Sequence, residues 1–335
     1  MPESQKKVKA IALLSGGLDS TLAIQIIRDQ GIEVLAVNFF SPFCTCDRPG
    51  HCEAVEVSEK LDVPLKRIGL GRDYIEMLKA PRYGYGRNMN PCLDCRILTF
   101  RKARELMEET GADFVFTGEV LGQRPMSQRK DAMRIVERDS GLMGRLLRPL
   151  SAKLMEPTIP EKDGLVDREK LLAIQGRSRK PQIQLARNLG INDYPCPAGG
   201  CLLTDKNFAA RLRDLFDHGE DDLYDIKLLK IGRHFRLPGG EKVIVGRDEE
   251  ENERLETMAR PDDHKFSAEQ FGSPLVVLRK SHTRERMEQA AAICARYSSG
   301  RHLDTVSVSF WLDSAEPGQL EVTPLPEHLL QEYKV

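Results

Sequence analysis

The pattern of hydrophobic and polar positions changes partway along this chain, and this change divides the chain into regions. Up to about residue 150, short apolar runs that predict buried strands alternate with amphipathic segments that predict helices. The strand-like runs are 8–14, 33–39, 64–69, 113–118 and 146–150. The helical segments between them are 20–30, 53–62 and 95–110. This alternation predicts an α/β domain with a parallel sheet, whose ligands lie beyond the carboxyl ends of the strands.

The pattern changes in the second half of the chain. Residues 151–220 are mostly helical in pattern, with the clearest helices at 167–175 and 179–190. From residue 221 short strands return, interrupted by helices near 248–258 and 283–297. The strands expected there are 226–232, 242–247, 274–279, 305–312 and 320–324. We therefore expect three parts: an α/β domain at 1–165, a helical segment at 166–220 and a smaller α+β domain at 221–335.

Composition narrows the class of protein. The chain has 335 residues, of which 40% are hydrophobic and 30% charged, as in a soluble globular protein of roughly two domains. Its formal net charge of −1 means that a nucleic acid would have to bind to a local basic patch. The first residues lack the apolar core of a signal peptide, and no apolar run is long enough for a membrane helix. These features predict a cytoplasmic protein without a membrane partner.

A glycine-rich loop, SGGLDS at 15–20, joins the first predicted strand to the first helix. Gly16 and Gly17 allow a tight turn and close approach of a ligand, and the helix that follows presents unpaired N–H groups to an anion. Ser15 and Ser20 add hydroxyl donors. Asp19 is unexpected in an anion site unless a divalent cation is bound there, so the loop implies Mg²⁺. The lysine of a Walker A loop is missing.

This loop resembles the PP-loop of ATP pyrophosphatases, which cleave ATP between the α and β phosphates and leave an adenylated substrate. A second segment, FTGEVLGQRPMSQ at 116–128, resembles the T-G-E-x-L-G-Q…S-Q segment of tRNA 4-thiouridine synthetases. The two resemblances imply a parallel-sheet adenine nucleotide α-hydrolase-like fold at 1–165. They also imply a set of residues that bind ATP or pyrophosphate. This set is Ser15, Gly16, Gly17, Asp19, Ser20, Gly118, Glu119 and Gln123.

Two cysteine motifs carry the candidate sulfur chemistry: NPCLDC at 90–95 and PCPAGGC at 195–201. Cys92 and Cys95 open a predicted helix, where the dipole is expected to lower the pKa of a thiol. Cys95 and Cys201 match the two cysteines of tRNA 2-thiouridylases, whereas Cys92 replaces an aspartate of that family. A C-x-x-C pair with one distant cysteine instead resembles the tRNA thiolases that bind a [4Fe–4S] cluster through three thiolates and leave one iron open.

Four interpretations of these cysteines stay open. They are a redox dithiol, a structural Zn²⁺ site, a persulfide on Cys95 or Cys201, and a [4Fe–4S] cluster on Cys92, Cys95 and Cys201, which is the preferred one. The zinc site would use Cys196 as well, and Cys196 is also an alternative third ligand of the cluster. A further group, in CTCDRPGHC at 44–52, either binds zinc, relays sulfur or is incidental. Its members are Cys44, Cys46, His51 and Cys52. Cys294 lies on the apolar face of a predicted helix and is expected in the core.

Basic residues and the C-terminal domain point to RNA. Two basic runs flank the proposed site, and their candidate phosphate contacts are Arg124, Arg129, Lys130, Arg177, Arg179 and Lys180. Residues 242–263 and 272–279 resemble the RNA-binding domain of NFACT proteins, although HKFSA stands where that family has a Trp-Leu-His element.

Together these features predict an ATP-dependent tRNA sulfurtransferase that adenylates a uridine carbonyl and replaces its oxygen with sulfur. Asp19, Cys95 and Cys201 are the predicted catalytic residues, and ATP, Mg²⁺ and a [4Fe–4S] cluster, or else Zn²⁺, are the expected cofactors. The partners would be tRNA and a sulfur donor, either free sulfide or a persulfide carrier such as a cysteine desulfurase; a homodimer is possible. The alternatives are a PP-loop ligase or amidase that acts on a small molecule and a non-catalytic RNA-binding protein.

Overall fold

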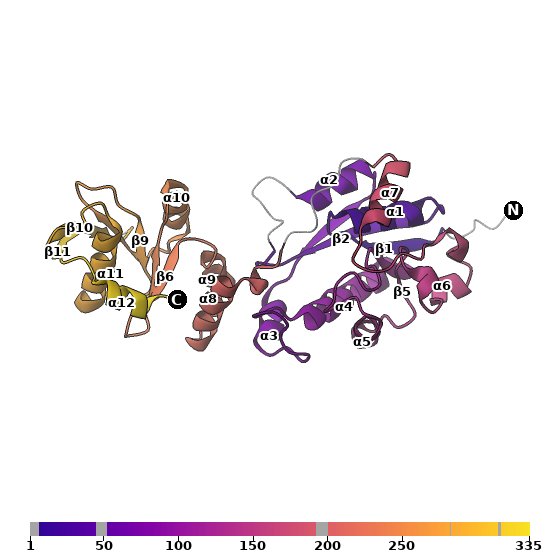
Figure 1. The fold of residues 1–335 in the computed structure, drawn as a ribbon, viewed down its shortest axis with the longest axis horizontal. Coiled ribbons are helices and arrows are strands. Elements are labelled where there is room, and N and C mark those ends of the chain that lie inside the picture. Colours follow the sequence, from indigo (N-terminus) through magenta and orange to yellow (C-terminus); the bar gives the residue numbers. More distant parts are fainter. Residues whose placement is uncertain (1–6, 45–51, 192–199, 282, 314–315) are drawn as a thin grey trace. The chain divides into compact units, whose positions relative to one another are not determined.

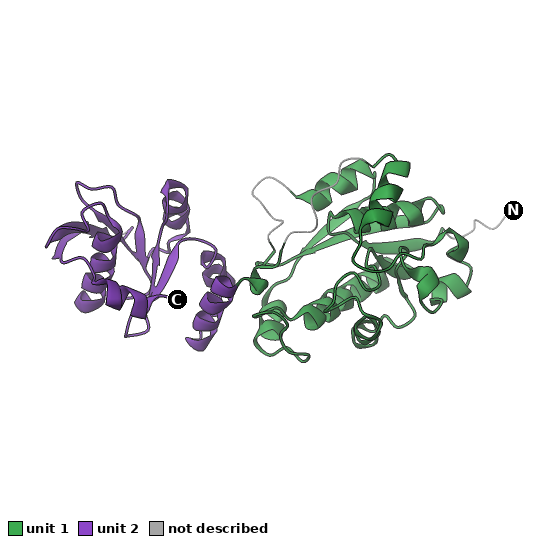
Figure 2. Ribbon diagram, viewed as in Figure 1, with its two compact units in different colours: residues 1–205 green, residues 206–335 purple. Residues whose placement is uncertain are grey.

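The computed structural model describes residues 7–44, 52–191, 200–281, 283–313 and 316–335. The chain forms two compact units, Met1–Asp205 and Lys206–Val335, which Figure 2 shows in green and purple. Leu171 and Ala186, from the segment predicted to be helical at 166–220, belong to the core of the first unit. No helix in the described ranges is long and apolar enough to cross a membrane.

The first unit is built on five parallel strands in the order β3-β2-β1-β4-β5, of which Figure 1 labels β1, β2 and β5. The strands are β1 Lys9–Leu13, β2 Glu33–Phe40, β3 Leu65–Gly69, β4 Phe114–Thr117 and β5 Leu146–Leu147. All five predicted strands are confirmed. Because β1 pairs in parallel with both β2 and β4, the chain reverses direction across the sheet at β1. Ligands of open parallel sheets bind at such a reversal, beyond the carboxyl ends of the strands.

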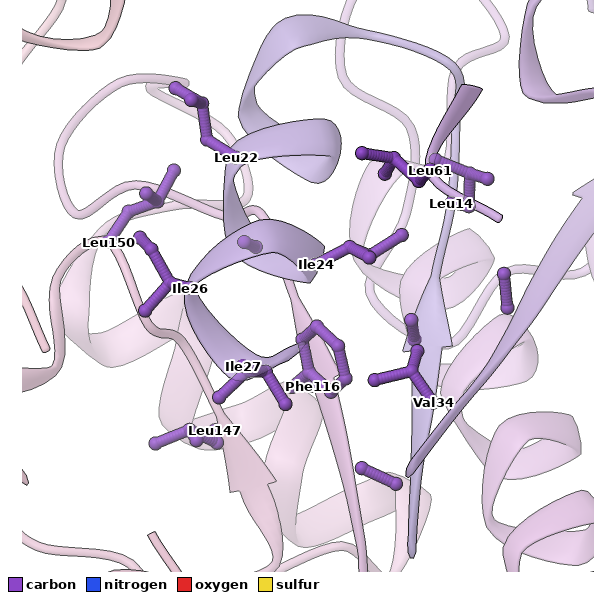
Figure 3. Close-up of a cluster of buried hydrophobic side chains, with 14 of the residues drawn as sticks. Leu14, Leu22, Ile24, Ile26, Ile27, Val34, Leu61, Phe116, Leu147 and Leu150 are labelled. Carbon is purple, nitrogen blue, oxygen red and sulfur yellow. The ribbon is translucent and has the colours of Figure 1, made fainter. Parts of the chain in front are cut away.

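Helices cover both faces of this sheet. They are α1 Leu18–Arg28, α2 Glu53–Lys60, α3 Arg72–Lys79, α4 Cys92–Thr110, α5 Lys130–Ser140, α6 Ile159–Lys162 and α7 Lys180–Asn188. One core lies under α1, α2 and α7, where side chains such as Leu22, Ile27 and Phe116 interlock (Figure 3). A second core lies between the other face and α4 with α5, around Phe100 and Val115. The sequence placed strands and helices well here because each element has its own apolar face.

One helix predicted in the first unit is wrong. Residues 167–175 contain only a short 3₁₀ turn at Arg168–Lys170 and then run extended. The amides of Leu172 and Ile174 donate to the carbonyls of Pro149 and Leu150, at 2.9 and 2.8 Å. These long-range backbone bonds compete successfully with a local helix, and no sequence pattern signals them.

The second unit contains a six-stranded antiparallel sheet in the order β11-β10-β8-β9-β7-β6. Its strands are β6 Arg233–Arg236, β7 Lys242–Val245, β8 His264–Ala268, β9 Val276–Leu278, β10 Val306–Trp311 and β11 Gly318–Val322. Its helices are α8 Lys206–Asp217, α9 Leu223–Leu228, α10 Glu249–Met258, α11 Arg284–Tyr297 and α12 Glu327–Tyr333. Cys294, on α11, is fully buried in the core of this unit, as predicted.

The predicted strand at 226–232 is wrong, since residues 223–228 form α9 instead. Asp222 caps this helix by accepting a hydrogen bond from the amide of Tyr224 at 2.9 Å. Leu228 and Ile231 then reach a small core that also contains Leu255. An N-terminal cap next to an apolar run favours a helix, and this signal outweighed the apolar content of the run.

Candidate active site

The glycine-rich loop turns sharply between β1 and α1. Gly16 has φ +83°, and a Cβ atom there would lie 2.6 Å from the Cβ of Glu53 at the start of α2. Only glycine fits, because the position requires both a left-handed backbone and close contact with α2. Gly17 is the N-cap of α1, so the loop lies at the N-terminus of that helix, where unpaired N–H groups can bind an anion.

Hydroxyl groups close the first turn of α1. The Ser20 hydroxyl donates to the carbonyl oxygen of Gly17 at 2.8 Å and lies 3.3 Å from the hydroxyl of Ser15. Thr21 also bonds the carbonyl of Gly17, at 3.2 Å. These bonds hold the loop in the open shape that an anion requires, with Ser15 and Ser20 both on the wall of a cavity.

Only one of the two carboxylate oxygens of Asp19 accepts a hydrogen bond from the described residues. Its Oδ2 accepts a hydrogen bond from the Gln123 amide at 2.9 Å, whereas its buried Oδ1 accepts none from the described residues. A buried carboxylate oxygen without a donor suits a cation. The donor chemistry at this position therefore fits Mg²⁺.

Gly118 allows the end of β4 to approach the first turn of α1. A Cβ atom at this position would lie 2.4 Å from the carbonyl carbon of Asp19 and from the amide nitrogen of Ser20. The close approach explains why Glu119 and Gln123, which follow β4, reach the same site as the loop. The sequence motif at 116–128 is therefore a packing motif as well as a polar one.

Glu119 is 4% exposed and held by two arginines. Arg148 Nε donates to its Oε2 at 3.1 Å, and Arg96 Nε lies 3.5 Å from its Oε1. Arg148 also pairs with Glu137, so this carboxylate is fixed from behind by a buried ion-pair network. Sequence reasoning missed Arg96 and Arg148, because their relation to Glu119 is made only by the fold.

A cavity of about 270 Å³ joins these groups. Ser15, Asp19 and Ser20 line it from the loop, and Gly118 and Glu119 line it from the end of β4. The other charged or sulfur-bearing residues on its wall are Arg96, Arg124, Glu53, Cys44 and Cys52. The cavity thus joins the predicted ATP residues to thiols and to two cations, in the place that the sheet topology predicts.

Three distant segments bring four thiols together next to this cavity. Cys44 and Cys201 are directly opposite each other in an antiparallel bridge, and the amide of Leu202 donates to the carbonyl of Phe43 at 3.1 Å. On its other side the segment after Cys201 bonds the loop before α4: Met89 N donates to the Leu203 carbonyl at 3.1 Å. This loop leads into Cys92 and Cys95 in the first turn of α4.

Tyr74 lies beside three of these thiols. It is 2% exposed, its ring is 5.7 Å from that of Phe43, and its hydroxyl donates to Cys95 Sγ at 3.6 Å. Burial, followed by the neighbouring Cys95, Cys201 and Cys44, raises the pKa of Tyr74 well above its ordinary value.

Burial also decides the state of the thiols. Desolvation raises the pKa of Cys92 and Cys95, although both stand at a helix N-terminus, and it raises the pKa of Cys201 to about 12. The expectation of lowered pKa values is therefore wrong, because burial outweighs the helix dipole at these positions. An electropositive species would be needed to hold these sulfurs as thiolates.

The remaining predicted sulfur residues are distributed differently. Cys196, Cys46 and His51 lie outside the described residues, whereas Cys52 lines the cavity as the N-cap of α2. Among the described residues, no three Cys, His, Asp or Glu side chains are arranged so that they could hold a metal ion as they stand. Cys44 is the residue whose role the sequence left open, and its position after the second strand was the signal.

The two basic runs meet at the edge of the site. Leu121 and Gln175 form a parallel bridge, and the amide of Gly176 donates to the Leu121 carbonyl at 2.7 Å. This pairing places Arg177 beside the segment of Arg124, and both side chains are exposed. Arg179 caps α7 and Lys180 begins it, whereas Arg129 pairs with Asp131 at 3.3 Å and Lys130 begins α5.

Comparison with known proteins supports the two-part organisation. Residues 8–138 match the family described as tRNA methyl transferase HUP domain, and residues 232–334 match the NFACT protein RNA binding domain. The tRNA-specific 2-thiouridylase MnmA 2 of Clostridium botulinum (strain Loch Maree / Type A3) is 27% identical over 200 residues. The match covers 56% of this chain and 52% of that protein, so the chain spans about half the length of this relative.

Two solved structures are similar to parts of the chain. One is a 4-thiouridine synthetase–RNA complex with bound ATP, with 22% identity, a TM-score of 0.41 and coverage of 67% of this chain and 51% of the other. The second is the U34-tRNA thiolase NcsA from Methanococcus maripaludis with its [4Fe-4S] cluster, with 14% identity, a TM-score of 0.33 and coverage of 69% and 74%. The resemblance of the first unit to the PP-loop tRNA thiouridine synthases and of the second to the NFACT RNA-binding domain, both predicted from sequence motifs, is confirmed by the family matches and the 2-thiouridylase relative.

Proposed function

We propose that this protein is an ATP-dependent tRNA sulfurtransferase, which adenylates a uridine carbonyl and replaces its oxygen with sulfur. The observation that carries the proposal is the common cavity. It is lined by the pyrophosphate loop, by Glu119 and by Cys44, and Cys44 is the cross-strand partner of Cys201. An ATP site and a sulfur site that share a wall suit a reaction in which activation and sulfur transfer occur on one base.

The loop end of the cavity would bind the phosphates of ATP. The N–H groups at the N-terminus of α1 and the Ser15 hydroxyl would donate to the leaving pyrophosphate, and Arg96 and Arg124 would add positive charge from the cavity wall. Asp19, fixed by Gln123, would hold Mg²⁺ through its Oδ1, and the ion would neutralise charge that develops on the phosphates.

The first chemical step forms an adenylate. The uridine carbonyl oxygen attacks the α-phosphorus of ATP, and the bond from that phosphorus to the β-phosphate oxygen breaks. Pyrophosphate leaves with the electron pair into the loop. The carbonyl oxygen, otherwise a very poor leaving group, is now esterified to AMP. Because Glu119 is held by Arg96 and Arg148, it is a fixed polar anchor beside the reacting groups.

The second step delivers sulfur. A sulfur nucleophile attacks the activated carbon of the base, and AMP leaves with the former carbonyl oxygen. Cys92, Cys95 and Cys201 have the soft donor chemistry of an iron–sulfur ligand set. A [4Fe–4S] cluster held by these thiolates would supply an open iron for hydrosulfide, with free sulfide or a persulfide carrier as the sulfur source.

A specific observation favours a second sulfur mechanism without a cluster. Cys44 directly faces Cys201, and Cα atoms of such cross-strand pairs are about 4.5–5.5 Å apart. This spacing lies within the range of about 4.4–6.8 Å that disulfides occupy. A persulfide on Cys201, supplied by a persulfide carrier, would attack the activated carbon with its outer sulfur as AMP leaves. The Cys44 thiolate would then attack Cys201 Sγ, break the S–S bond to the base and release the thiolated uridine. The Cys44–Cys201 disulfide that remains would be reduced by an external dithiol.

The proposal is tested by nucleoside mass spectrometry of tRNA from cells with and without this gene. One thiolated uridine should disappear with the gene and return on complementation. It should not return with the Asp19→Asn or Cys201→Ser variants, if these accumulate to the wild-type level. An unchanged set of thiolated nucleosides would exclude the proposal, and pyrophosphate release without RNA would instead favour a ligase that acts on a small molecule.

The cluster is tested on protein purified without oxygen. The cluster mechanism predicts about four irons per chain and broad visible absorption, both lost in Cys92→Ser. Stoichiometric zinc, or full activity with no metal, would reject the cluster in favour of the persulfide mechanism.

A further inference from the structure

Two exposed hydrophobic side chains lie on neighbouring segments beside the cavity. Tyr85, from the loop between α3 and α4, is 42% exposed, and Met126, from the segment after β4, is 49% exposed. The two segments touch: a Cβ atom at Gly86, next to Tyr85, would lie 3.0 Å from Met126 Cε. Met126 itself stands between Arg124 and Gln128, which both line the cavity. An apolar surface at the entrance of a polar site indicates a partner with an apolar face.

The Tyr85 ring is held in place. Its hydroxyl donates to the Leu78 carbonyl at the end of α3, at 2.6 Å. The loop behind it is fixed by the bond from the Gly86 amide to the Asn90 carbonyl at 2.8 Å. Asn88 adds a bond from its amide to the Thr204 carbonyl, at 2.7 Å. A ring that is oriented before binding loses little conformational freedom when a planar ligand stacks on it.

Cations flank this apolar surface. Arg87 is exposed and makes no ion pair with any part of the chain that the structure describes, and Arg124 is exposed and lines the cavity. Arg177 lies on the segment that pairs with Leu121, so a third exposed cation stands near the same edge. An aromatic ring and a methionine between arginines match a planar, apolar base joined to phosphates.

We propose that Tyr85 and Met126 form a stacking platform for one unpaired base of the RNA substrate, next to the base that enters the cavity, with Arg87 on its phosphate. This inference rests on the proposed function and names the substrate class: RNA whose target region is single-stranded. A base-paired neighbour cannot stack on the ring without leaving its helix, so the platform discriminates against duplex RNA.

The test compares the binding of two probes to full-length protein. They are a fluorescein-labelled oligouridylate 12-mer and a fully paired, blunt-ended RNA duplex of the same length. Tyr85→Ala should weaken binding of the oligouridylate about tenfold, which lies within the range known for one base–aromatic stack. It should leave binding of the duplex unchanged. Tyr85→Phe keeps the ring and should retain most of the affinity.

Two matched variants separate stacking from charge. Met143→Ala removes a methionine that is 50% exposed elsewhere in the same unit, and it should change neither affinity. Arg87→Gln should weaken both probes and reduce the slope of log affinity against log salt by about 0.7 for the single strand. Equal losses for both probes in Tyr85→Ala, or no loss for either, would overturn the platform.

A spectroscopic measurement makes the result independent of folding effects. Trp311 is the single tryptophan of the chain and lies in the second unit, so Trp311→Phe provides a dark background. In that background, fluorescence of Tyr85→Trp should be quenched by the oligouridylate and not by the duplex. Quenching without any tRNA thiolation would defeat the proposed function but leave the platform intact. If Tyr85→Ala lowers thiolation only when a persulfide carrier replaces free sulfide, the surface binds that protein and the RNA inference is wrong.

Discussion

Both units of this chain bury charged side chains, but they use them differently. In the first unit Asp19 keeps a buried oxygen without a donor among the described residues, at the wall of a cavity. In the second unit Asp214 binds two cations, since Arg236 Nη2 and Lys242 Nζ lie 2.7 and 2.5 Å from its Oδ2. Both residues are aspartates, so the difference between the proposed active site and the structural ion-pair network lies in which polar groups lack a hydrogen-bond partner among the described residues.

The largest effect is expected in the structural network. Asp214→Ala leaves Lys242, which is 4% exposed, without its carboxylate and should destabilise the second unit by about 3–5 kcal/mol. Urea unfolding followed by Trp311 fluorescence measures this, because the only tryptophan lies in that unit. Glu288→Ala removes an exposed partner of Arg284 and should cost less than about 1 kcal/mol. Similar losses for both variants would contradict the contrast.

The reverse pattern is expected for Asp19. Asp19→Asn should lower the rate of pyrophosphate release with tRNA by about 10²–10³-fold, because a charge that faces the transferred phosphates is lost. The free energy of unfolding should stay within about 0.5 kcal/mol of wild type, since Asp19 makes no ion pair with the residues that the structure describes. Asp29→Asn, at the C-terminal end of the same helix, is the control and should retain full activity. A destabilised but active Asp19→Asn protein would show that this carboxylate has a structural role and no catalytic one.

The pH dependence of stability distinguishes the second unit further. Burial lowers the pKa of Lys242 from 10.5 to about 8, so between these values the unfolded chain holds a proton that the folded chain has lost. Stability should therefore rise with pH in this window, by about 2 kcal/mol between pH 8 and 10. Lys242→Met should lack this rise. An identical pH profile for both proteins would show that Lys242 is not the group that titrates.

The sequence predicted the parallel sheet, the glycine-rich loop and the candidate sulfur residues Cys92, Cys95 and Cys201, because each depends on a local pattern or motif. It did not predict the relations made by distant backbone bonds. Residues 167–175 were expected to be helical but pair with Pro149 and Leu150, and Arg148 reaches Glu119 only through the ends of neighbouring strands. The pKa values of Cys92 and Cys95 were misjudged for the same reason, since a helix start is visible in the sequence and burial is not.

The smallest effect, and the finest test of the site, concerns Cys44. Cys44→Ser should lower thiolation about tenfold, as expected for a side chain that assists the reacting groups, while pyrophosphate release continues. Cys52→Ser is the matched control, because Cys52 lines the same cavity as Cys44 but stands at the N-cap position of α2 and is not the bridge partner of Cys201.

Treatment of the reduced protein with a mild thiol oxidant should join Cys44 to Cys201, since cross-strand partners already have the separation that a disulfide requires. Peptide mass spectrometry would detect the link, and a dithiol should reverse it and restore thiolation. A link from Cys201 to Cys95 instead would place Cys44 outside the sulfur chemistry. Because oxidation leaves Asp19 untouched, the oxidised protein should still release pyrophosphate. A single disulfide would then block sulfur transfer without affecting adenylation.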